Sequence, residues 1–492
     1  MPHSDSRSTA PPAIVWFHDD LRVADHPALA AAVESGQPLI ALYLLEEESA
    51  GLRPLGGASR WWLAGSLRAL DAALRQRGGA LTLRRGAAAQ ALPALAAETG
   101  ATAVYWNRRH DPAGAAIDQA VAEALAKRGT AVHTYQATLL FAPEDVRTRS
   151  GAPFAVFTPF LRHVRSIKPP RTPVPAPGAI NGADAIASED LDDWKLEPRA
   201  PDWAAGFADH WTRGEVAARD KLVAFVDASL AAYAGERDRP DRTGTSRLSP
   251  HLRFGEVSPF QVWHAIEAAR EAGGRAAAVE VGAEKFIAEL VWREFCHHLL
   301  AHHPDLATRN VQARFDAFLW RDDPAALTAW QRGATGYPIV DAGMRELWAT
   351  GWMHNRVRMV TASFLAKHLL IDWRAGERWF WDTLVDADLA NNPANWQWVA
   401  GSGADAAPYF RIFNPALQGQ KFDPAGTYVR RWLPELAGLP DDVIHTPEQA
   451  PPTLLAAAGV TLGKTYPAPI VDHKAARARA LGAFERIKER GR

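Results

Sequence analysis

Cysteine is almost absent from this sequence, since Cys296 is the only one among 492 residues. A single thiol excludes an internal disulfide and any metal site made of several cysteines. Cys296 follows Trp292 and Phe295 in a helical pattern, so we expect a buried structural thiol. The histidines between 297 and 303 would scatter around a helix, and the sequence therefore predicts no metal site.

Long apolar runs are absent as well. No stretch approaches the length of a membrane span, and residues 1–12 lack the hydrophobic region of a signal peptide. We therefore expect a cytoplasmic protein that does not enter a membrane. No G-x-G-x-x-G motif follows the first expected strand, so a dinucleotide site there has no support. With a net charge of −1, a nucleic-acid partner would need a local basic patch, for which residues 345–378 are a candidate.

The first third of the chain alternates short β-rich runs with helical runs rich in alanine and leucine. Strands are expected at 14–17, 39–45, 81–84, 103–106 and 131–135. This alternation produces right-handed βαβ units and a doubly wound parallel sheet with helices on both faces. The chain is too long for one core, so we expect an α/β domain at 13–140 followed by further domains.

Proline recurs between 168 and 203, which forbids a regular helix there and predicts an extended connector within 141–215. After about residue 215 the pattern turns helical and stays helical. Helices are expected at 217–233, 259–272, 278–303, 324–332, 338–350, 357–370 and 376–384. The remainder, 216–492, is therefore predicted to be an all-α domain.

The stretch 386–415, DADLANNPANWQWVAGSGADAAPYFRIFNP, is the most informative part of the chain. If it is helical, Asn392 and Trp396 share one face while Trp398 points elsewhere. The alternative, core tryptophans beside a polar turn, is weakened because the interleaved amides and acids would need buried partners.

Other segments combine polar groups at helical spacing. Asn355, Arg358 and Met359 would share a face, and Asp386 is a natural partner for a buried Arg358, although a purely structural ion pair would look the same. Residues 245–249 (TSRLS) offer hydroxyls and amides ahead of a helical region, which suits a phosphate but also any N-cap.

Several ordered motifs give the chain a resemblance to the photolyase/cryptochrome family of blue-light flavoproteins, specifically its cyclobutane pyrimidine dimer photolyases. They lie at 14–29, 243–259, 289–295, 335–359 and 386–415. The family usually carries Arg where this chain has His18. The resemblance implies an N-terminal α/β domain and a helical FAD-binding domain. It also implies a monomeric deoxyribodipyrimidine photo-lyase that repairs UV-damaged DNA by electron transfer from photoexcited reduced FAD.

The resemblance also assigns residues. The FAD site would comprise Tyr233, Thr245, Ser246, Arg247, Leu248, Ser249, Arg293, Asn355, Arg358, Asp386, Asp388 and Asn392. The lesion would contact Glu289, Trp292, Asn355, Met359 and Trp398. Glu289 and Asn392 would act in catalysis, and Trp396, Trp373 and Trp320 would relay an electron to the flavin. Arg356 and Arg411 would face DNA.

The resemblance favours 5,10-methenyltetrahydrofolate over 8-hydroxy-5-deazaflavin as an antenna chromophore. Some family members hold folate through an Asn-Glu pair, but the aligned positions here are Ala113 and Gly114. The surrounding segment, WNRRHDPAG, resembles a bacterial branch close to plant cryptochromes, which binds folate in another pocket. A cryptochrome photoreceptor is the alternative function. The short tail, the amide of Asn392 and the retained Trp398 oppose it.

Overall fold

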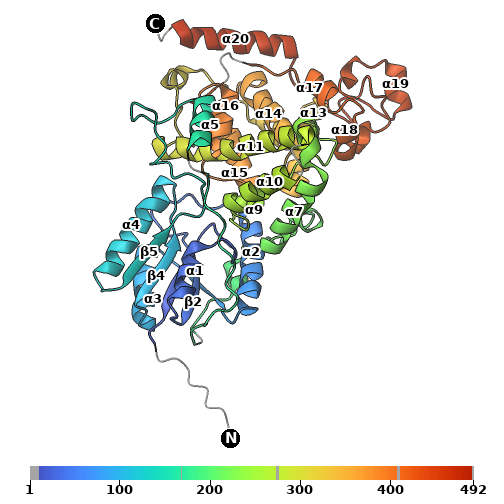
Figure 1. The fold of residues 1–492 in the computed structure, drawn as a ribbon. Helices are drawn as coiled ribbons and strands as arrows, with labels where there is room; N and C mark the ends of the chain where they lie inside the picture. The colour runs from blue at the N-terminus through green and yellow to red at the C-terminus, as the bar shows by residue number, and fades with distance from the viewer. Residues whose placement is uncertain (1–9, 168, 185, 273–275, 407–410, 490–492) are drawn as a thin grey trace.

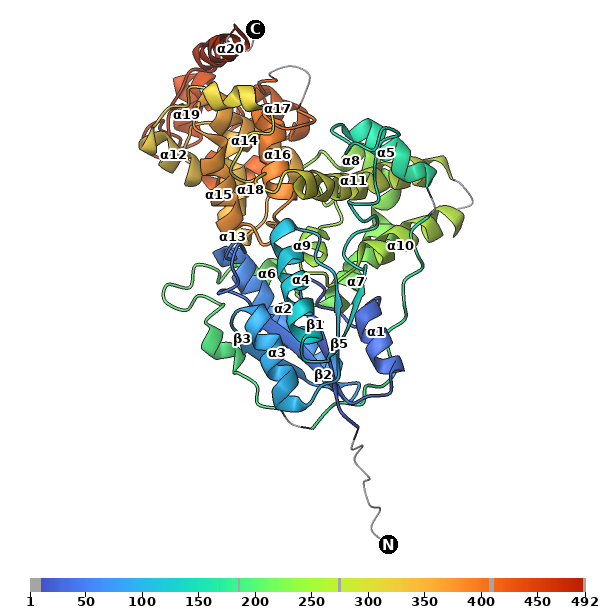
Figure 2. The same cartoon turned by 90° about the vertical axis from the view of Figure 1, so that its left-hand side faces the viewer.

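The computed structural model describes residues 10–489 except 168, 185, 273–275 and 407–410. Figures 1 and 2 show two stacked halves: a sheet covered by helices, and a helical half that carries the C-terminal helix α20 at its far end. Among the described residues, no helix is both long and apolar enough to cross a membrane.

The N-terminal half is a five-stranded parallel sheet in the order β3-β2-β1-β4-β5. Its strands are β1 Ala13–Phe17, β2 Leu39–Leu45, β3 Leu81–Arg85, β4 Ala103–Asn107 and β5 Ala131–Tyr135. One face packs on α1 Pro27–Glu34 and α2 Gly57–Arg75, the other on α3 Ala88–Thr99 and α4 Pro112–Ala126. The predicted doubly wound sheet is confirmed, and its strand order reverses between β1 and β4.

The chain between the sheet and the helical half follows an irregular path. It contains α5 Phe157–Ser166, a 3₁₀ turn η1 Leu191–Trp194 and the short α6 Phe207–His210. Ile180 packs into the core of the sheet, and Gly182 pairs with Leu39 at the start of β2. The proline-rich segment thus lies along the α/β half before the chain enters the helices.

The described part of the second half is built from helices, as predicted. The longer ones are α7 Glu215–Ala228, α10 Pro259–Ala272, α11 Ala277–His302, α12 Pro324–Gln331, α13 Pro338–Thr350, α14 Asn355–Ser363, α15 Trp373–Thr383, α16 Asn391–Ala400, α17 Pro415–Phe422 and α20 His473–Glu489. Shorter segments are η2 Leu230–Ala232, α8 Tyr233–Glu236, α9 Ser249–Arg253, η3 Ala313–Ala317, α18 Thr427–Trp432, η5 Pro434–Leu436, η6 Pro447–Gln449 and α19 Pro452–Ala457. The helix expected at 357–370 is instead α14 followed by a π-helical turn, η4 Phe364–His368.

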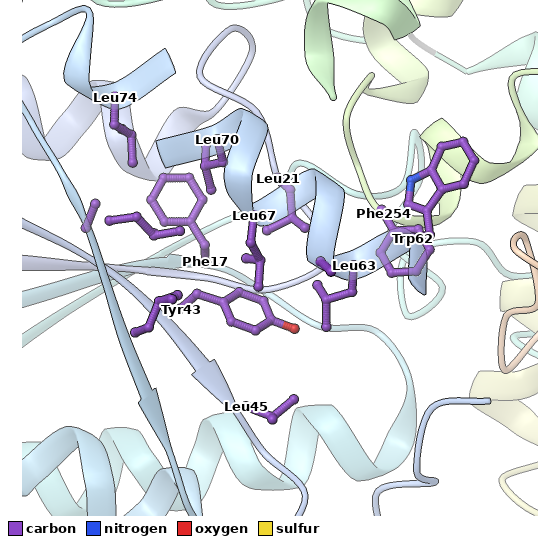
Figure 3. Close-up of a cluster of buried hydrophobic side chains, with 14 of the residues drawn as sticks. Phe17, Leu21, Tyr43, Leu45, Trp62, Leu63, Leu67, Leu70, Leu74 and Phe254 are labelled. Atoms are coloured by element: carbon purple, nitrogen blue, oxygen red, sulfur yellow. The ribbon is translucent and has the colours of Figure 1, made fainter. Parts of the chain in front are cut away.

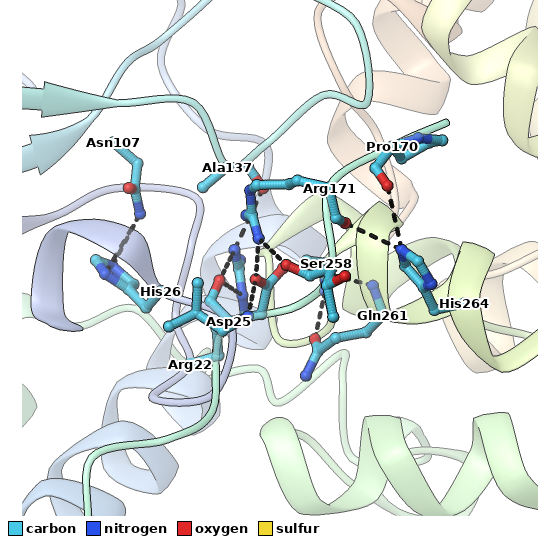
Figure 4. Close-up of polar contacts among 12 residues, drawn as sticks. Arg22, Asp25, His26, Asn107, Ala137, Pro170, Arg171, Ser258, Gln261 and His264 are labelled. Atoms are coloured by element: carbon cyan, nitrogen blue, oxygen red, sulfur yellow. Dashed lines mark hydrogen bonds and ion pairs between the residues drawn. The ribbon is translucent and has the colours of Figure 1, made fainter. Parts of the chain in front are cut away.

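Apolar and polar contacts join the halves. Figure 3 shows Phe254, from the end of α9, beside Trp62 of α2, with ring centroids 6.3 Å apart and planes at 16°. Figure 4 shows Arg22, whose guanidinium donates to the carbonyl oxygens of Asp25 (2.7 Å) and Gly255 (2.9 Å). The carboxylate of Asp25 accepts from Ser258. Separating the halves would remove the carbonyl of Gly255 from the buried Arg22 and the hydroxyl of Ser258 from the buried Asp25.

Candidate flavin and lesion site

Helix α16 lies at the centre of the predicted site and packs against α11, α14 and α15. Its first turn is held by Asp388, whose carboxylate accepts from the backbone N–H groups of Ala390 (2.8 Å) and Asn391 (2.5 Å). Burial acts to raise the pKa of Asp388, but His297 and these hydrogen bonds lower it overall. Asn392 and Trp396 follow on one buried face.

The predicted pairing of Arg358 with Asp386 is confirmed. The guanidinium of Arg358, on α14, donates to both carboxylate oxygens of Asp386 at 3.0 and 2.8 Å, and its Nε donates to the carbonyl of Met353 at 2.7 Å. The side chain of Asp386 is 3% exposed and that of Arg358 is 24% exposed. Arg358 therefore neutralises the charge of a buried carboxylate, and part of its side chain remains exposed.

Asn392 has a partner that sequence reasoning missed. Its Nδ2 donates to the backbone oxygen of Glu377 on α15 at 3.0 Å and to the Oε1 of Glu377 at 2.8 Å. Glu377 in turn pairs with Arg53, which precedes it by 324 residues. No local pattern could have revealed a contact across that separation.

Residues expected near the cofactor phosphates form the approach to α9. Tyr233 is buried between Phe225 and Phe286. Arg247 has a left-handed backbone (φ 51°), and its guanidinium lies 4.3 Å from the ring centre of Trp211. Burial lowers the pKa of Arg247.

In the segment 245–249, the hydroxyl groups of the two serines make few hydrogen bonds within the protein. Thr245 and Leu248 are the remaining members of this segment. The Oγ of Ser246 accepts from the N–H of Leu248 at 3.4 Å. The Oγ of Ser249 accepts from Trp352 Nε1 at 3.2 Å. Ser246, Thr245 and the half-buried Arg247 therefore remain close to the surface, where an anion can reach them.

The structure brings together the two tryptophans expected at the lesion. Trp292 of α11 and Trp398 of α16 line one small pocket of about 20 Å³, and Trp292 stacks on Phe157 with ring centroids 3.7 Å apart. Of the described residues, Glu289, Asn355 and Met359 are not part of that lining. Asn355 is exposed and Met359 half-buried, at the start of α14.

Glu289 has its own cationic partners. It pairs with Arg237 and lies 3.4 Å from the Nζ of Lys285. Arg237, which sequence reasoning missed, follows Tyr233 by four residues, and that helical spacing was a usable signal.

Arg293 faces the segment after the sheet. It donates to the Oε1 of Glu294 (2.9 Å) and to the carbonyl of Thr138 (3.0 Å). Burial raises the pKa of Glu294 to about 7, although Arg293 and the N–H groups of Leu140 and Phe141 oppose the rise. Arg293 is thus tied to the segment that follows β5, and no hydrogen bond or ion pair with the Arg358–Asp386 pair is formed among the described residues.

The three relay candidates lie in adjoining parts of the helical core. Trp396 packs so closely on α15 that a Cβ at Gly376 would lie 2.1 Å from its ring. Trp373 lies at the start of α15, one turn before Gly376. It is fully buried, and its ring N–H donates to the side-chain oxygen of Asn310 at 2.9 Å. Trp320 is half-buried and lies 4.4 Å from Phe318 between ring centroids.

The two arginines expected at DNA differ in their surroundings. Arg356 donates to Asp238 at 2.8 Å and lies over the ring of Phe422. Arg411 is exposed, and its backbone oxygen accepts from Lys367. Phe410, the first residue of the FRIFNP motif, lies outside the described residues.

Comparisons with known proteins agree with this architecture. Residues 13–178 match the family described as DNA photolyase, and residues 286–486 match the FAD binding domain of DNA photolyase. A deoxyribodipyrimidine photo-lyase of Agrobacterium fabrum is 53% identical over 97% of this chain and 98% of its own length. The crystal structure of a bacterial class III photolyase from Agrobacterium tumefaciens has a TM-score of 0.94 at 52% identity, covering 99% of this chain and 100% of that one. Cryptochrome-1 of Arabidopsis thaliana is 40% identical over 96% of this chain and 70% of its own length.

A doubly wound sheet docked on a helical half with a buried amide and ion pair is the architecture of a light-dependent flavoprotein. The chain belongs to the DNA photolyase family. Its residues fit FAD on two observations. Arg358 keeps an open edge while paired, and Asn392 spends both N–H groups on Glu377, which leaves its oxygen for a ligand.

Proposed function

We propose that this protein is a deoxyribodipyrimidine photo-lyase that uses light and reduced FAD to split cyclobutane pyrimidine dimers in DNA. The observation that carries the proposal is the joined set on α14, α15 and α16: the Arg358–Asp386 pair, the oriented amide of Asn392 and the adjacent Trp396. When bound, FAD supplies light absorption and the electron. The chain's own residues bind and orient.

Each group has a separable task in this proposal. Arg358 and Asp386 hold the flavin ring, with Asp388 at the start of α16. Thr245, Ser246, Arg247, Leu248 and Ser249 receive the phosphates, and Tyr233 and Arg293 complete the FAD site. Trp292 and Trp398 form apolar walls for a dimer flipped out of the duplex, because such a base loses its stacking partners.

Substrate choice follows from the groups on α14. Repair of a (6-4) photoproduct requires proton transfer, whereas a cyclobutane ring opens once it has received an electron. Asn355 and Met359 can neither donate nor remove a proton near neutral pH. Glu289 is the carboxylate on the lesion side, where it pairs with Arg237.

We also propose the finer features of the protein. Its domains are 13–140, 141–215 and 216–492, it acts as a monomer, and its antenna is 5,10-methenyltetrahydrofolate. Ala113 and Gly114 offer no polar side chain to a folate, which supports a site elsewhere than at 113–114. An absorption spectrum of freshly purified protein distinguishes folate from a deazaflavin.

The proposed activity is tested with oligonucleotides that carry one defined lesion. The holoprotein, chemically reduced beforehand, is illuminated with duplexes containing either a cyclobutane dimer or a (6-4) product. We expect restoration of the dimer alone. Repair of the (6-4) product without the dimer would overturn the substrate assignment, and no repair of either would favour a cryptochrome.

A further inference from the structure

We propose that Arg53, in the loop between β2 and α2, is a positioning residue for the flavin. It holds Glu377, and Glu377 orients the amide of Asn392. This inference rests on the proposed function, because it takes Asn392 to face the flavin. It adds that a residue of the α/β half helps to set the properties of a cofactor bound in the helical half.

The loop that carries Arg53 is held firmly against α15. The guanidinium of Arg53 donates to both oxygens of Glu377, at 2.6 and 3.0 Å, and lies 4.0 Å from the ring centre of Trp381. Trp381 Nε1 donates to the carbonyl of Pro54 at 2.8 Å. A Cβ at Gly56 would lie 2.1 Å from the backbone oxygen of Trp381, so this contact is backbone against backbone. Arg53 therefore reaches Glu377 from a fixed base, where α2 meets α15.

The hydrogen bonds of Asn392 determine the orientation of its amide. Nδ2 lies 3.0 Å from the backbone oxygen of Glu377 and 2.8 Å from Oε1, and both of these atoms are acceptors. A flipped amide would place its own oxygen against the same two oxygens, so only one orientation is favourable. No donor among the described residues reaches Oδ1. Asn392 can therefore only accept a hydrogen bond from a ligand.

We take the acceptor oxygen of Asn392 to face the N5 atom of the flavin ring, where it discriminates between the oxidised and the reduced flavin. The N5 atom of the ring carries a hydrogen when the flavin is reduced and a lone pair when it is oxidised. A carbonyl oxygen stabilises the N–H and repels the lone pair. The orientation of Asn392 thus favours the reduced cofactor, which is the form that the proposed repair uses.

Glu377 can serve as an anchor only while it remains a charged acceptor. Its side chain is 1% exposed, and Arg53 is the only cation that pairs with it among the described residues. A buried carboxylate that loses its cation is left with an uncompensated charge and tends to turn away. That movement lets the amide of Asn392 rotate, and the preference for reduced flavin is lost.

The test is a redox titration of the flavin, followed by absorption, in holoprotein variants. Arg53→Gln should lower the equilibrium constant for flavin reduction by roughly fivefold, about the net value of one hydrogen bond. Arg60→Gln is the matched control, since Arg60 is a neighbouring arginine of α2 that pairs with Glu47. It should leave the constant unchanged.

A double variant separates positioning from the plain loss of a positive charge. If Arg53 acts through the amide, Arg53→Gln should have no effect in an Asn392→Ala background. An undiminished effect there would overturn the proposal, as would the absence of any effect in the single variant. Arg53→Lys keeps the charge without the two-pronged geometry and should still lower the constant, and it replaces Arg53→Gln if that variant binds no FAD. If Asn392→Ala alone leaves the constant unchanged, the flavin site itself is misplaced, and the proposed function fails instead.

Discussion

At the carboxyl edge of the sheet, Arg109 contacts two carboxylates, Glu46 at 2.6 Å and Asp118 at 2.7 Å, and all three side chains are nearly buried. In the helical half, Arg358 pairs with one carboxylate of the described chain, Asp386, and its side chain stays 24% exposed. Burial raises the pKa of Glu46 and of Asp118, and Arg109 opposes both shifts. The sheet-edge cluster is thus compensated within itself. The helical cluster leaves binding capacity for a ligand.

The same difference appears among the aromatic residues. Trp106 of β4 lies in the sheet core, 5.7 Å from Trp16 between ring centroids. Trp396 lies next to α15 and borders the Asn392 site on the same helix. One buried tryptophan thus packs the sheet core, and we propose that the other packs beside the flavin.

Replacing these tryptophans sharpens the comparison and should have the largest effect. Trp396→Phe should abolish photoreduction of oxidised FAD, because the relay loses the member nearest the flavin. Trp106→Phe should retain the wild-type rate. The measurement is the absorption of bound flavin under blue light with an external reductant. Repair by chemically reduced Trp396→Phe should persist, and photoreduction at the wild-type rate in this variant would show that the relay is misplaced.

Removing one carboxylate should destabilise the protein more in the helical cluster than in the sheet-edge cluster. Asp386→Asn removes the one carboxylate that pairs with Arg358 among the described residues. It should cost about 3 kcal/mol in the free energy of unfolding, together with most of the bound FAD. Glu46→Gln leaves Arg109 with Asp118 and should cost about 1 kcal/mol, with FAD retained. Urea unfolding and flavin content check both variants. Equal costs would show that the two clusters are compensated in the same way.

Acid should lower the stability of the fold through protonation of His18, at the edge of the sheet, in the unfolded chain. Burial lowers the pKa of His18 well below its usual range, and Arg109 adds to the shift. The unfolded chain therefore binds a proton below about pH 6.5 that the folded chain does not, and stability falls as the pH drops through that value. His18→Phe should reduce the loss of stability as the pH falls below about 6.5. Identical pH profiles of unfolding for the variant and the wild type would contradict this.

Single arginine side chains of the helical half should contribute measurably to DNA binding. Arg411→Gln should weaken binding and reduce the salt slope by about one unit, or about fourfold in affinity between 50 and 200 mM salt. Arg356→Gln should have a smaller effect, because Arg356 is already paired with Asp238. Arg128→Gln, at the exposed end of α4, is the control. Salt slopes that match the wild type in both helical variants would remove these arginines from the interface.

Local pattern alone was enough to predict most of the fold. The strands expected at 39–45 and 131–135 have the bounds of β2 and β5, and the helical half begins at Glu215 as expected. Strand and helix periods depend on neighbouring residues, so a single chain displays them. The connection of Arg358 with Asp386 was also predicted, since a buried arginine must find a carboxylate and the motif supplied one.

The tertiary structure decided which polar groups complete the site. Sequence reasoning found neither Arg237 beside Glu289 nor Arg53 and Glu377 behind Asn392. It also missed the π-helical turn after α14. A residue's type and its near neighbours determine its preferred local conformation, and that information is present in the sequence. Whether two charges separated by 324 residues meet depends on how α2 docks on α15, and this docking follows only from the packing of the whole chain.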